Sequence, residues 1–233
     1  MPRDVGVVVV AAGRGERLGG VPKQYRELAG VPMLLRSIRP FASHPDVVHV
    51  IVVIAGADAA APPEWLGTLA GSALTVIAGG AERSDSVAAG LAALPLACAV
   101  VLIHDAARPF VERSVIDEVI ATARSGSGAV AAVRVSDTLK ECIGESAADA
   151  RTVVRTVPRE RMWRAQTPQG FPRALLESAY AAAARDGVRA TDDAALVERT
   201  GADVRVVPDS PRNFKVTTAD DLVLAELWAR HAP

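Results

Sequence analysis

The 233-residue sequence is poor in the residues that mark redox, metal-binding or membrane proteins. Its two cysteines, Cys98 and Cys142, stand far apart without C-x-x-C spacing, which gives no support to a metal or redox site. Cys98 lies in an apolar run, where a buried thiol is expected. No apolar run is long enough to cross a bilayer, so we expect no membrane partner.

Aromatic residues and net charge are also scarce. Aromatics make up 4% of the chain and hydrophobic residues 50%, so the core must consist mainly of Ala, Val and Leu. The 26 Lys and Arg nearly balance the 27 Asp and Glu, which argues against nucleic acid as a partner. The apolar run at 5–12 is short and leads into a charged loop instead of a cleavage site. A cytoplasmic protein is therefore expected.

Short segments rich in Val and Ile alternate with amphipathic segments along the chain. This alternation predicts βαβ units, and hence an α/β fold with a mostly parallel, buried sheet flanked by helices. The expected strands are 5–11, 47–55, 74–78, 99–104, 129–135 and 204–207. The expected helices are 33–41, 64–69, 84–94, 113–124, 173–185, 193–199 and 219–229. Val87, Leu91 and Leu94 are spaced to face the sheet from one helix.

The segment at about 136–161 interrupts this alternation. It is polar and lacks a sustained apolar period, but 137–142 and 152–157 can pair as a β-hairpin. A projecting two-stranded arm cannot bury itself, so we expect it to lie against a second subunit of a homodimer. The chain shows no repeat or linker. The prediction is a single domain, 1–233, with a dimerisation arm.

The most informative segment is 7–23, where an apolar strand runs into a glycine loop followed by two cations, Arg17 and Lys23. Gly13 and Gly15 have no Cβ, which lets a loop turn sharply and point its N–H groups at a ligand. Bare amides and cations together suit a polyphosphate. The segment therefore predicts a polyphosphate site.

Two common phosphate motifs do not fit this loop. A dinucleotide fingerprint requires a third glycine where this chain has Leu18. A P-loop requires glycine, lysine and a hydroxyl in succession, whereas Lys23 follows Pro22 and precedes Gln24. The pattern that fits, G-x-G-x-R-L followed by P-K, resembles nucleotidyltransferases that join a sugar or polyol phosphate to a nucleotide.

A second glycine turn, Gly79-Gly80, follows the expected strand at 74–78. Loops after parallel strands lie at the carboxyl edge of the sheet, where ligands of such folds bind. Backbone groups there can read the edge of a base, and the Ser86 hydroxyl can donate or accept. Ser84 or Asp85 is also a suitable N-cap for the next helix.

A third cluster, His104 to Pro109, follows the strand at 99–104. Asp105 suits sugar hydroxyls or a divalent cation, and Arg108 suits a phosphate, although the two also make an ordinary surface ion pair. Phosphate monoesters are already ionised at neutral pH, so a reaction in which such a phosphate is the nucleophile needs no general base. His104 is accordingly expected to be structural.

Three later positions have simpler interpretations. Thr191 resembles a helix N-cap, and Pro168 and Pro172 indicate loop turns. Lys215 differs from these three, because it interrupts a strand-like run and is placed to direct a cation into a ligand cleft.

Taken in order, these motifs resemble the 2-C-methyl-D-erythritol 4-phosphate cytidylyltransferases of the non-mevalonate isoprenoid pathway. The blocks span Ala11 to Thr217 and are A-A-G-x-G-x-R-L…P-K-Q-Y, G-G-x-E-R-x-D-S-V, H-D-A-A-R-P, D-T-x-K, T-P-Q, T-D-D-A and F-K-V-T. The resemblance implies a Rossmann-like nucleotidyltransferase fold and a homodimer whose arm reaches the partner's site. Ribitol-5-phosphate cytidylyltransferases are similar in several blocks. A non-catalytic nucleotide-binding regulatory protein is the alternative from another class.

The resemblance also implies residue roles, with CTP and methylerythritol phosphate as substrates. Arg17 and Lys23 would be catalytic. The CTP-binding residues would be Ala11, Ala12, Gly13, Gly15, Arg17, Lys23, Gly79, Gly80, Ser86, Asp105 and Ala106. The residues around the polyol phosphate would be Asp105, Arg108, Thr138, Arg159, Thr167, Thr191 and Lys215. Mg²⁺ would bridge triphosphate oxygens, held mainly by phosphates and water and by no protein ligand.

Two positions depart from the family pattern. Val10 stands where family members often carry Pro, and Ala81 stands where they often carry an acid. If that acid supports the nucleotide through its side chain, the affinity of this chain for the nucleotide should be weaker. If the contact is made by the main chain, it would survive with Ala81.

Overall fold

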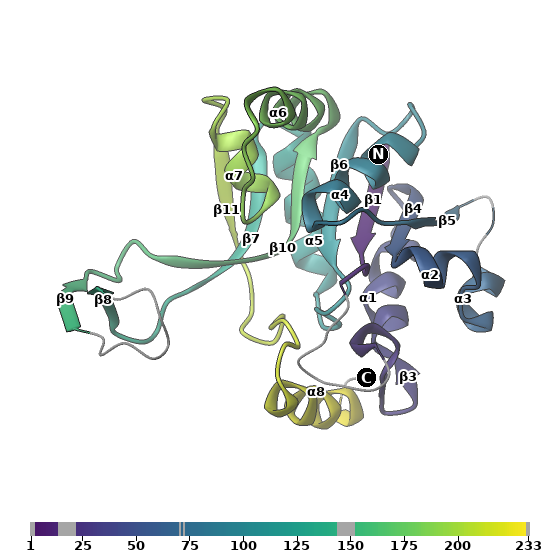
Figure 1. Cartoon of the computed structure of the whole chain (residues 1–233), viewed down its shortest axis with the longest axis horizontal. Helices are drawn as coiled ribbons and strands as arrows, with labels where there is room; N and C mark the ends of the chain where they lie inside the picture. The colour runs from purple at the N-terminus through teal and green to yellow at the C-terminus, as the bar shows by residue number, and fades with distance from the viewer. Residues whose placement is uncertain (1–2, 14–21, 70, 72, 144–151, 232–233) are drawn as a thin grey trace.

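A computed structural model describes residues 3–13, 22–69, 71, 73–143 and 152–231. Its centre is a seven-stranded sheet in the order β11-β7-β10-β6-β1-β4-β5 (Figure 1). The strands are β1 (Val5–Val10), β4 (Val47–Ile54), β5 (Leu74–Ala78), β6 (Val100–Asp105), β7 (Gly128–Arg134), β10 (Trp163–Pro172) and β11 (Val204–Pro208). Every strand expected from apolar alternation is present to within one residue at each end, which confirms the α/β prediction.

The sheet is mostly parallel. β1 pairs in parallel with β4 and β6, β4 with β5, and β7 with β11. After β5 the chain crosses to the opposite side of β1 to form β6, so β1 and β6 flank a reversal in strand order. In open α/β sheets, ligands bind outside the carboxyl ends of strands at such a reversal.

β10 is a strand of the central sheet that the sequence did not predict. It runs antiparallel to both β6 and β7, and Pro168 lies inside it, at a register shift between Ala165 and Gln169. The prediction of a loop turn at Pro168 and Pro172 is therefore wrong. Proline donates no ladder hydrogen bond, but a bulge or a strand end does not need that donor.

Helices cover both faces of the sheet. The first face carries α1 (Met33–Ala42), α3 (Glu64–Leu69) and α5 (Arg113–Arg124), and the second carries α4 (Arg83–Ala93), α6 (Arg173–Asp186) and α7 (Asp193–Glu198). Val87, Leu91 and Leu94 are buried against Val8, Ile51 and Val53, as their spacing predicted. Cys98 is buried in the same cluster and Cys142 is exposed.

The remaining elements are small or peripheral. η2 (Lys23–Tyr25), β2 (Glu27–Leu28), β3 (Val31–Pro32) and α2 (Gly56–Ala60) were not predicted. The closing helix α8 (Ala219–His231) packs Ala225 and Ala229 against Leu28 and Met33 below the sheet (Figure 1). Among the described residues, no helix combines the length and the hydropathy of a membrane span.

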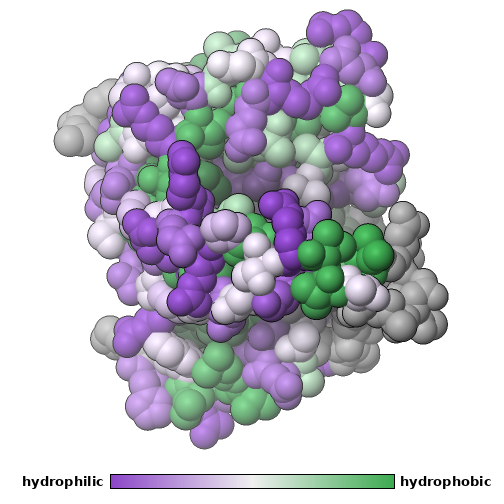
Figure 2. Space-filling model, turned by 90° about the vertical axis from the view of Figure 1, so that its left-hand side faces the viewer, coloured by the Kyte–Doolittle hydropathy of each residue, from purple (hydrophilic) through white to green (hydrophobic). Residues whose placement is uncertain are grey.

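The predicted arm contains β8 (Leu139–Ile143) and β9 (Thr152–Val157), paired antiparallel. It projects sideways from the sheet in Figure 1. Its apolar residues Ile143, Val153 and Val154 are exposed, and Figure 2, which looks at this side of the molecule, shows hydrophobic groups among hydrophilic ones. Within the described residues, nothing in this chain covers the arm.

Candidate active site

Two hollows open at the carboxyl edge of the sheet. The first, of about 220 Å³, lies where β1 and β6 end, beside the start of α4. The second, also about 220 Å³, lies between the end of β6, the first half of β10 and the residues before α7. Arg83, Asp105 and Lys215 line both hollows. We call these three residues the shared wall, because they are common to the two spaces.

Most residues predicted to bind nucleotide line the first hollow. They are Ala11, Ala12, Gly13, Lys23, Gly80, Ser86, Asp105 and Ala106. Gly79 does not line it but lies directly behind, where its N–H donates to the Ile54 carbonyl at 2.8 Å. Gly15 and Arg17 lie outside the described residues.

The second hollow contains most residues predicted to bind the polyol phosphate. Asp105, Arg108, Thr167, Thr191 and Lys215 line it. The structure therefore brings together residues from the end of β6, from β10 and from the loops before α7 and α8.

Asp105 is the centre of the shared wall. Its Oδ2 lies 2.9 Å from Lys215 Nζ and 3.7 Å from Arg108 Nε, and its Oδ1 lies 3.3 Å from Arg83 Nε. Burial alone would raise the pKa of Asp105, but Lys215, Arg83 and Arg108 outweigh burial and hold it far below its usual range. Asp105 is therefore an anion within a cluster of cations, a setting that suits phosphate groups nearby.

Arg108 is buried, and its Nη1 donates to the Asn213 carbonyl at 2.8 Å. Burial lowers its pKa from the ordinary arginine value, although the Asp105 and Asp209 carboxylates oppose that effect. An arginine remains charged under these conditions. The predicted surface ion pair between Asp105 and Arg108 is thus a buried one.

Behind the wall, His104 is fully buried and lines neither hollow. Thr167 Oγ1 accepts from the Asp105 N–H at 3.0 Å, so its proton is available to His104 Nδ1 at 3.1 Å. His104 Nε2 then donates to the Arg108 carbonyl at 3.0 Å. Burial lowers the pKa of His104 to about 4, so the ring is neutral at pH 7. This geometry agrees with the structural role expected for His104.

The glycine turn before α4 is closely packed. A Cβ on Gly79 would lie 2.6 Å from both Ala12 Cβ and Ser86 Oγ, and a Cβ on Gly80 would lie 2.3 Å from Asp85 Cβ. The Ser86 hydroxyl donates to the Glu82 carbonyl at 3.1 Å and accepts from the Gly80 N–H at 3.2 Å. The glycines thus let two loops approach each other at the first hollow.

The helix caps differ from the sequence prediction. The N-cap of α4 is Glu82, whose N–H donates to Asp85 Oδ2 at 3.0 Å, so Ser84 is not the cap and Asp85 acts from inside the helix. The N-cap of α7 is Asp192, whose Oδ1 accepts from the Ala195 N–H at 3.0 Å. Thr191 is not the cap, and it lines the second hollow.

Gly13 needs no special backbone conformation. Its φ is not in the left-handed region, and a Cβ there would meet nothing within 4 Å. Lys23, at the start of η2, reaches the first hollow and donates to the Val216 carbonyl at 3.1 Å. Val216 follows Lys215, so this hydrogen bond holds Lys23 beside the segment that contributes Lys215 to the shared wall.

A family model described as 2-C-methyl-D-erythritol 4-phosphate cytidylyltransferase (IspD) matches residues 5–231. The chain belongs to this family. A curated family member from Salinibacter ruber is 43% identical over 97% of this chain and 94% of its own length. A bifunctional enzyme IspD/IspF from Rhodospirillum rubrum is 44% identical over 95% of this chain, which spans only 56% of that longer protein.

Solved structures agree with this assignment. The crystal structure of the Thermus thermophilus 2-C-methyl-D-erythritol 4-phosphate cytidylyltransferase is 38% identical, with a TM-score of 0.79 over 97% of this chain and 99% of that one. The similarity confirms the predicted nucleotidyltransferase fold.

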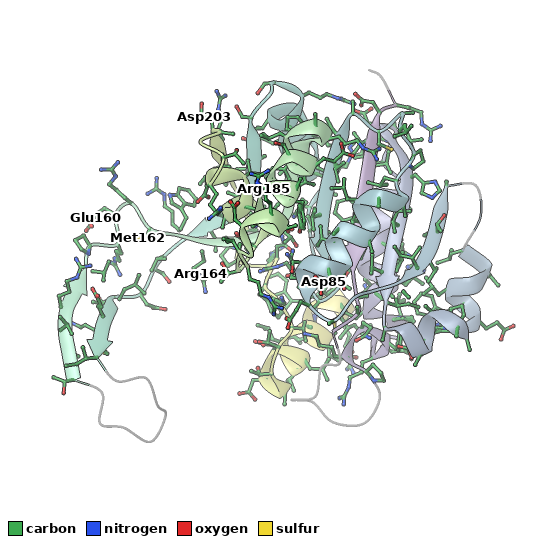
Figure 3. The ribbon with its side chains drawn as sticks, turned by 45° about the horizontal axis from the view of Figure 1, so that its top comes forward. Asp85, Glu160, Met162, Arg164, Arg185 and Asp203 are labelled. Atoms are coloured by element: carbon green, nitrogen blue, oxygen red, sulfur yellow. The ribbon has the colours of Figure 1, made fainter. Side chains whose placement is uncertain are left out.

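Two residues that the family resemblance placed at the site lie on the arm. Thr138 and Arg159 are exposed, line neither hollow, and Arg159 Nη1 donates to the Ser136 carbonyl near the base of the arm. Figure 3 labels the neighbouring Glu160 and Met162 on the arm, far from Asp85 at the start of α4. This chain by itself does not bring them to the other predicted residues of an IspD site.

Arg83 is the functional candidate that sequence reasoning missed. It stands inside the G-G-x-E-R-x-D-S-V block, but helix capping accounted for its neighbours and no role was assigned to it. The signal was a cation three residues after a glycine turn at the carboxyl edge of the sheet.

The described residues offer no group of three or more His, Cys, Asp or Glu side chains that could hold a metal ion. Both oxygens of Asp105 already face cations. This donor set does not provide a protein cage for Mg²⁺, which prefers several oxygen ligands.

Proposed function

We propose that this protein transfers CMP from CTP to 2-C-methyl-D-erythritol 4-phosphate. The products are 4-diphosphocytidyl-2-C-methyl-D-erythritol and pyrophosphate, in the non-mevalonate isoprenoid pathway. Membership of the IspD family supports the reaction. The observation that carries the proposal in this chain is the shared wall, because two substrates must meet for one phosphate to attack another.

In this proposal CTP occupies the first hollow and the polyol phosphate occupies the second. An oxygen of the polyol phosphate attacks the α-phosphorus in line, the new P–O bond forms, and the bond to the β-phosphate oxygen breaks. The attacking phosphate is already ionised, so no general base is needed, consistent with the neutral, buried His104. Catalysis then depends on positioning and on cations that stabilise charge on the phosphates.

The cations divide between the two substrates. Lys23, with Arg17 as a further predicted residue, serves the triphosphate and the leaving pyrophosphate. Lys215 and Arg108 serve the phosphate of the polyol. Since Lys215 pairs with Asp105 at 2.9 Å, an incoming phosphate competes with Asp105 for this ammonium group.

We further propose that Mg²⁺ would be held mainly by triphosphate oxygens and water, where it would neutralise charge on the phosphates. Asp105 is left to accept hydroxyl hydrogen bonds from the ribose and the polyol. Thr138 and Arg159 would act in the second hollow of a partner subunit, in a homodimer joined through the arms. The expected location is the cytoplasm.

The test is pyrophosphate release with CTP, Mg²⁺ and either methylerythritol 4-phosphate or ribitol 5-phosphate. We expect release with methylerythritol phosphate. Release with ribitol phosphate alone would keep the chemistry and replace the substrate. Binding of CTP without release with either polyol would contradict the catalytic proposal and favour a nucleotide-binding regulatory protein.

A further inference from the structure

Arg83 lies between two carboxylates. Its Nε is 3.3 Å from Asp105 Oδ1, and its Nη2 is 2.8 Å from Asp193 Oδ2. Burial would lower the pKa of Arg83, but the charges of Asp193 and Asp105 raise it above its ordinary value. The Nε side of the guanidinium therefore contacts Asp105, while Nη2 is anchored to Asp193, the first residue of α7.

Asp193 is built as an anchor. Its side chain is only 1% exposed and lines neither hollow. The Tyr180 hydroxyl donates to Asp193 Oδ1 at 2.5 Å, which leaves Oδ2 directed at Arg83. Burial and the Asp193 charge raise the pKa of Tyr180, so the phenol stays protonated and remains a donor. A carboxylate buried this deeply is stable only when it is paired and hydrogen-bonded.

The backbone around Asp193 is fixed as well. Asp192 caps α7 with one oxygen and accepts from Gln169 Nε2 with the other, at 2.9 Å. Gln169 Oε1 accepts from the Ala194 N–H at 2.9 Å. These contacts fasten the start of α7 to β10, so the anchor of Arg83 cannot shift independently of the sheet.

Asp105 contacts the anchored Arg83 through one of its two oxygens. Lys215 and Arg108 both approach Oδ2, whereas among the described residues Arg83 is the cation that the structure places at Oδ1. If Arg83 turned away, the carboxylate would be drawn toward Lys215, the lysine that the polyol phosphate needs. A displacement of about 1 Å at a reacting centre can cost up to ~10²-fold in rate.

We infer that Asp193 is a positioning residue for the reaction: through Arg83 it fixes the Asp105 carboxylate between the nucleotide and the polyol phosphate. This inference rests on the proposed function. The competing interpretation is an ion pair that only ties α4 to α7. That interpretation predicts a loss of stability without a specific loss of turnover.

The experiment is a double-mutant cycle on the full-length protein with Arg83→Gln, Asp193→Asn and both together. Values of kcat and KM for CTP and for methylerythritol phosphate are measured on folded protein, with thermal unfolding followed in parallel. Arg189→Gln is the matched control, because it removes an exposed arginine–glutamate pair with Glu82, adjacent to Arg83. Its kcat should stay within about twofold of the unmutated protein.

We expect each single variant to lose on the order of 10-fold or more in kcat, with KM for CTP changed by less than about threefold. Since the two residues act through one another, the kcat of the double variant should lie within about threefold of that of the less active single variant. Losses that multiply, or lower unfolding temperatures with unchanged kcat, would overturn the inference.

Two further measurements keep the result decisive. If Asp193→Asn does not fold, Tyr180→Phe replaces it, since it keeps both charges and removes only the hydrogen bond that orients Asp193. A several-fold loss of kcat is then expected, and unchanged kcat would reject the inference. If the unmutated protein releases no pyrophosphate, the proposed function fails instead of the positioning role.

Discussion

The shared wall and the arm place their predicted site residues in opposite environments. Asp105 in the wall is 7% exposed, and three cationic side chains approach it within 3.7 Å. On the arm, Thr138 and Arg159 are exposed, and within the described part of the chain β8 and β9 pair with each other and with no other strand. One chain therefore completes the wall, whereas the arm residues require another surface before they can form part of a site.

The two regions also differ in what each ion pair contributes to stability. Removing one partner from a buried pair leaves an uncompensated charge and costs about 3–5 kcal/mol. An exposed pair contributes about 0–1 kcal/mol, because water and salt screen it. Replacement of the buried Asp105 should therefore alter activity and stability together, while substitutions on the arm should alter activity alone.

The largest effect is expected from Lys23→Ala. Lys23 lines the first hollow and is predicted to contact the triphosphate as charge moves to pyrophosphate. We expect kcat to fall by about 10²-fold or more, with a smaller change in KM for CTP. Steady-state kinetics measure both constants, and a higher KM with unchanged kcat would reject a transition-state role.

Arg159→Ala sharpens the comparison, because it asks which subunit the arm serves. This variant alone should lose about 10-fold or more in kcat, with an unfolding temperature close to that of the unmutated protein. In the proposed homodimer, exchange of its subunits with those of Lys23→Ala should restore activity, because one site of each mixed dimer then combines an intact body with an intact arm. Random exchange predicts about a quarter of full activity.

Gly79→Ala should destabilise the protein by about 1–3 kcal/mol, because the added Cβ lies 2.6 Å from Ala12 Cβ and Ser86 Oγ. Gly13→Ala is the matched control, since its Cβ would meet nothing within 4 Å. Chemical denaturation compares the two. Equal losses of stability would show that close packing is not the reason for the glycine pair.

Acid should weaken the region behind the wall before it affects Asp105. The folded-state pKa of His104 is lowered from 6.5 to about 4 by burial, so the unfolded chain binds the proton more tightly. Stability from this group is complete above pH 6.5 and is lost as pH falls toward 4, at up to about 1.4 kcal/mol per pH unit. Unfolding free energies at pH 7, 6 and 5, with His104→Gln for comparison, measure the slope attributable to His104. Equal slopes in both proteins would contradict this assignment.

The smallest effect is expected from Glu141→Gln on the arm. Glu141 pairs with Arg155 across the hairpin, and both side chains are about half or more exposed. The change in unfolding free energy should stay below about 0.5 kcal/mol. A loss above 2 kcal/mol would contradict this expectation and would mean that the pair is buried in an assembly.

Regular elements were predictable where burial alone decides the sequence pattern. Buried parallel strands such as β1 appear as continuous runs of apolar residues and glycine, and the match with prediction is within one residue. β10 was missed because Pro168 and Pro172 resemble turn residues, and the bulge that accommodates Pro168 is a tertiary feature. Thr191 was taken as a cap because it and Asp192 are both good N-caps, and only the structure distinguishes them.

The site was predictable in part. Glycine turns and charged residues after strands indicated which segments face the carboxyl edge, and most of the assigned residues do line the two hollows. The link from Asp193 through Arg83 to Asp105 was not predictable, because it joins residues distant in sequence through side-chain geometry. Sequence spacing contains no information on which cation faces which oxygen.

The most direct test of the central claim is a crystal structure of the protein with 4-diphosphocytidyl-2-C-methyl-D-erythritol bound. The account predicts the cytidine in the first hollow, the methylerythritol in the second, and the diphosphate beside Arg83, Asp105 and Lys215. A nucleotide and polyol that both lie on one side of this wall, or a ligand bound elsewhere, would contradict it.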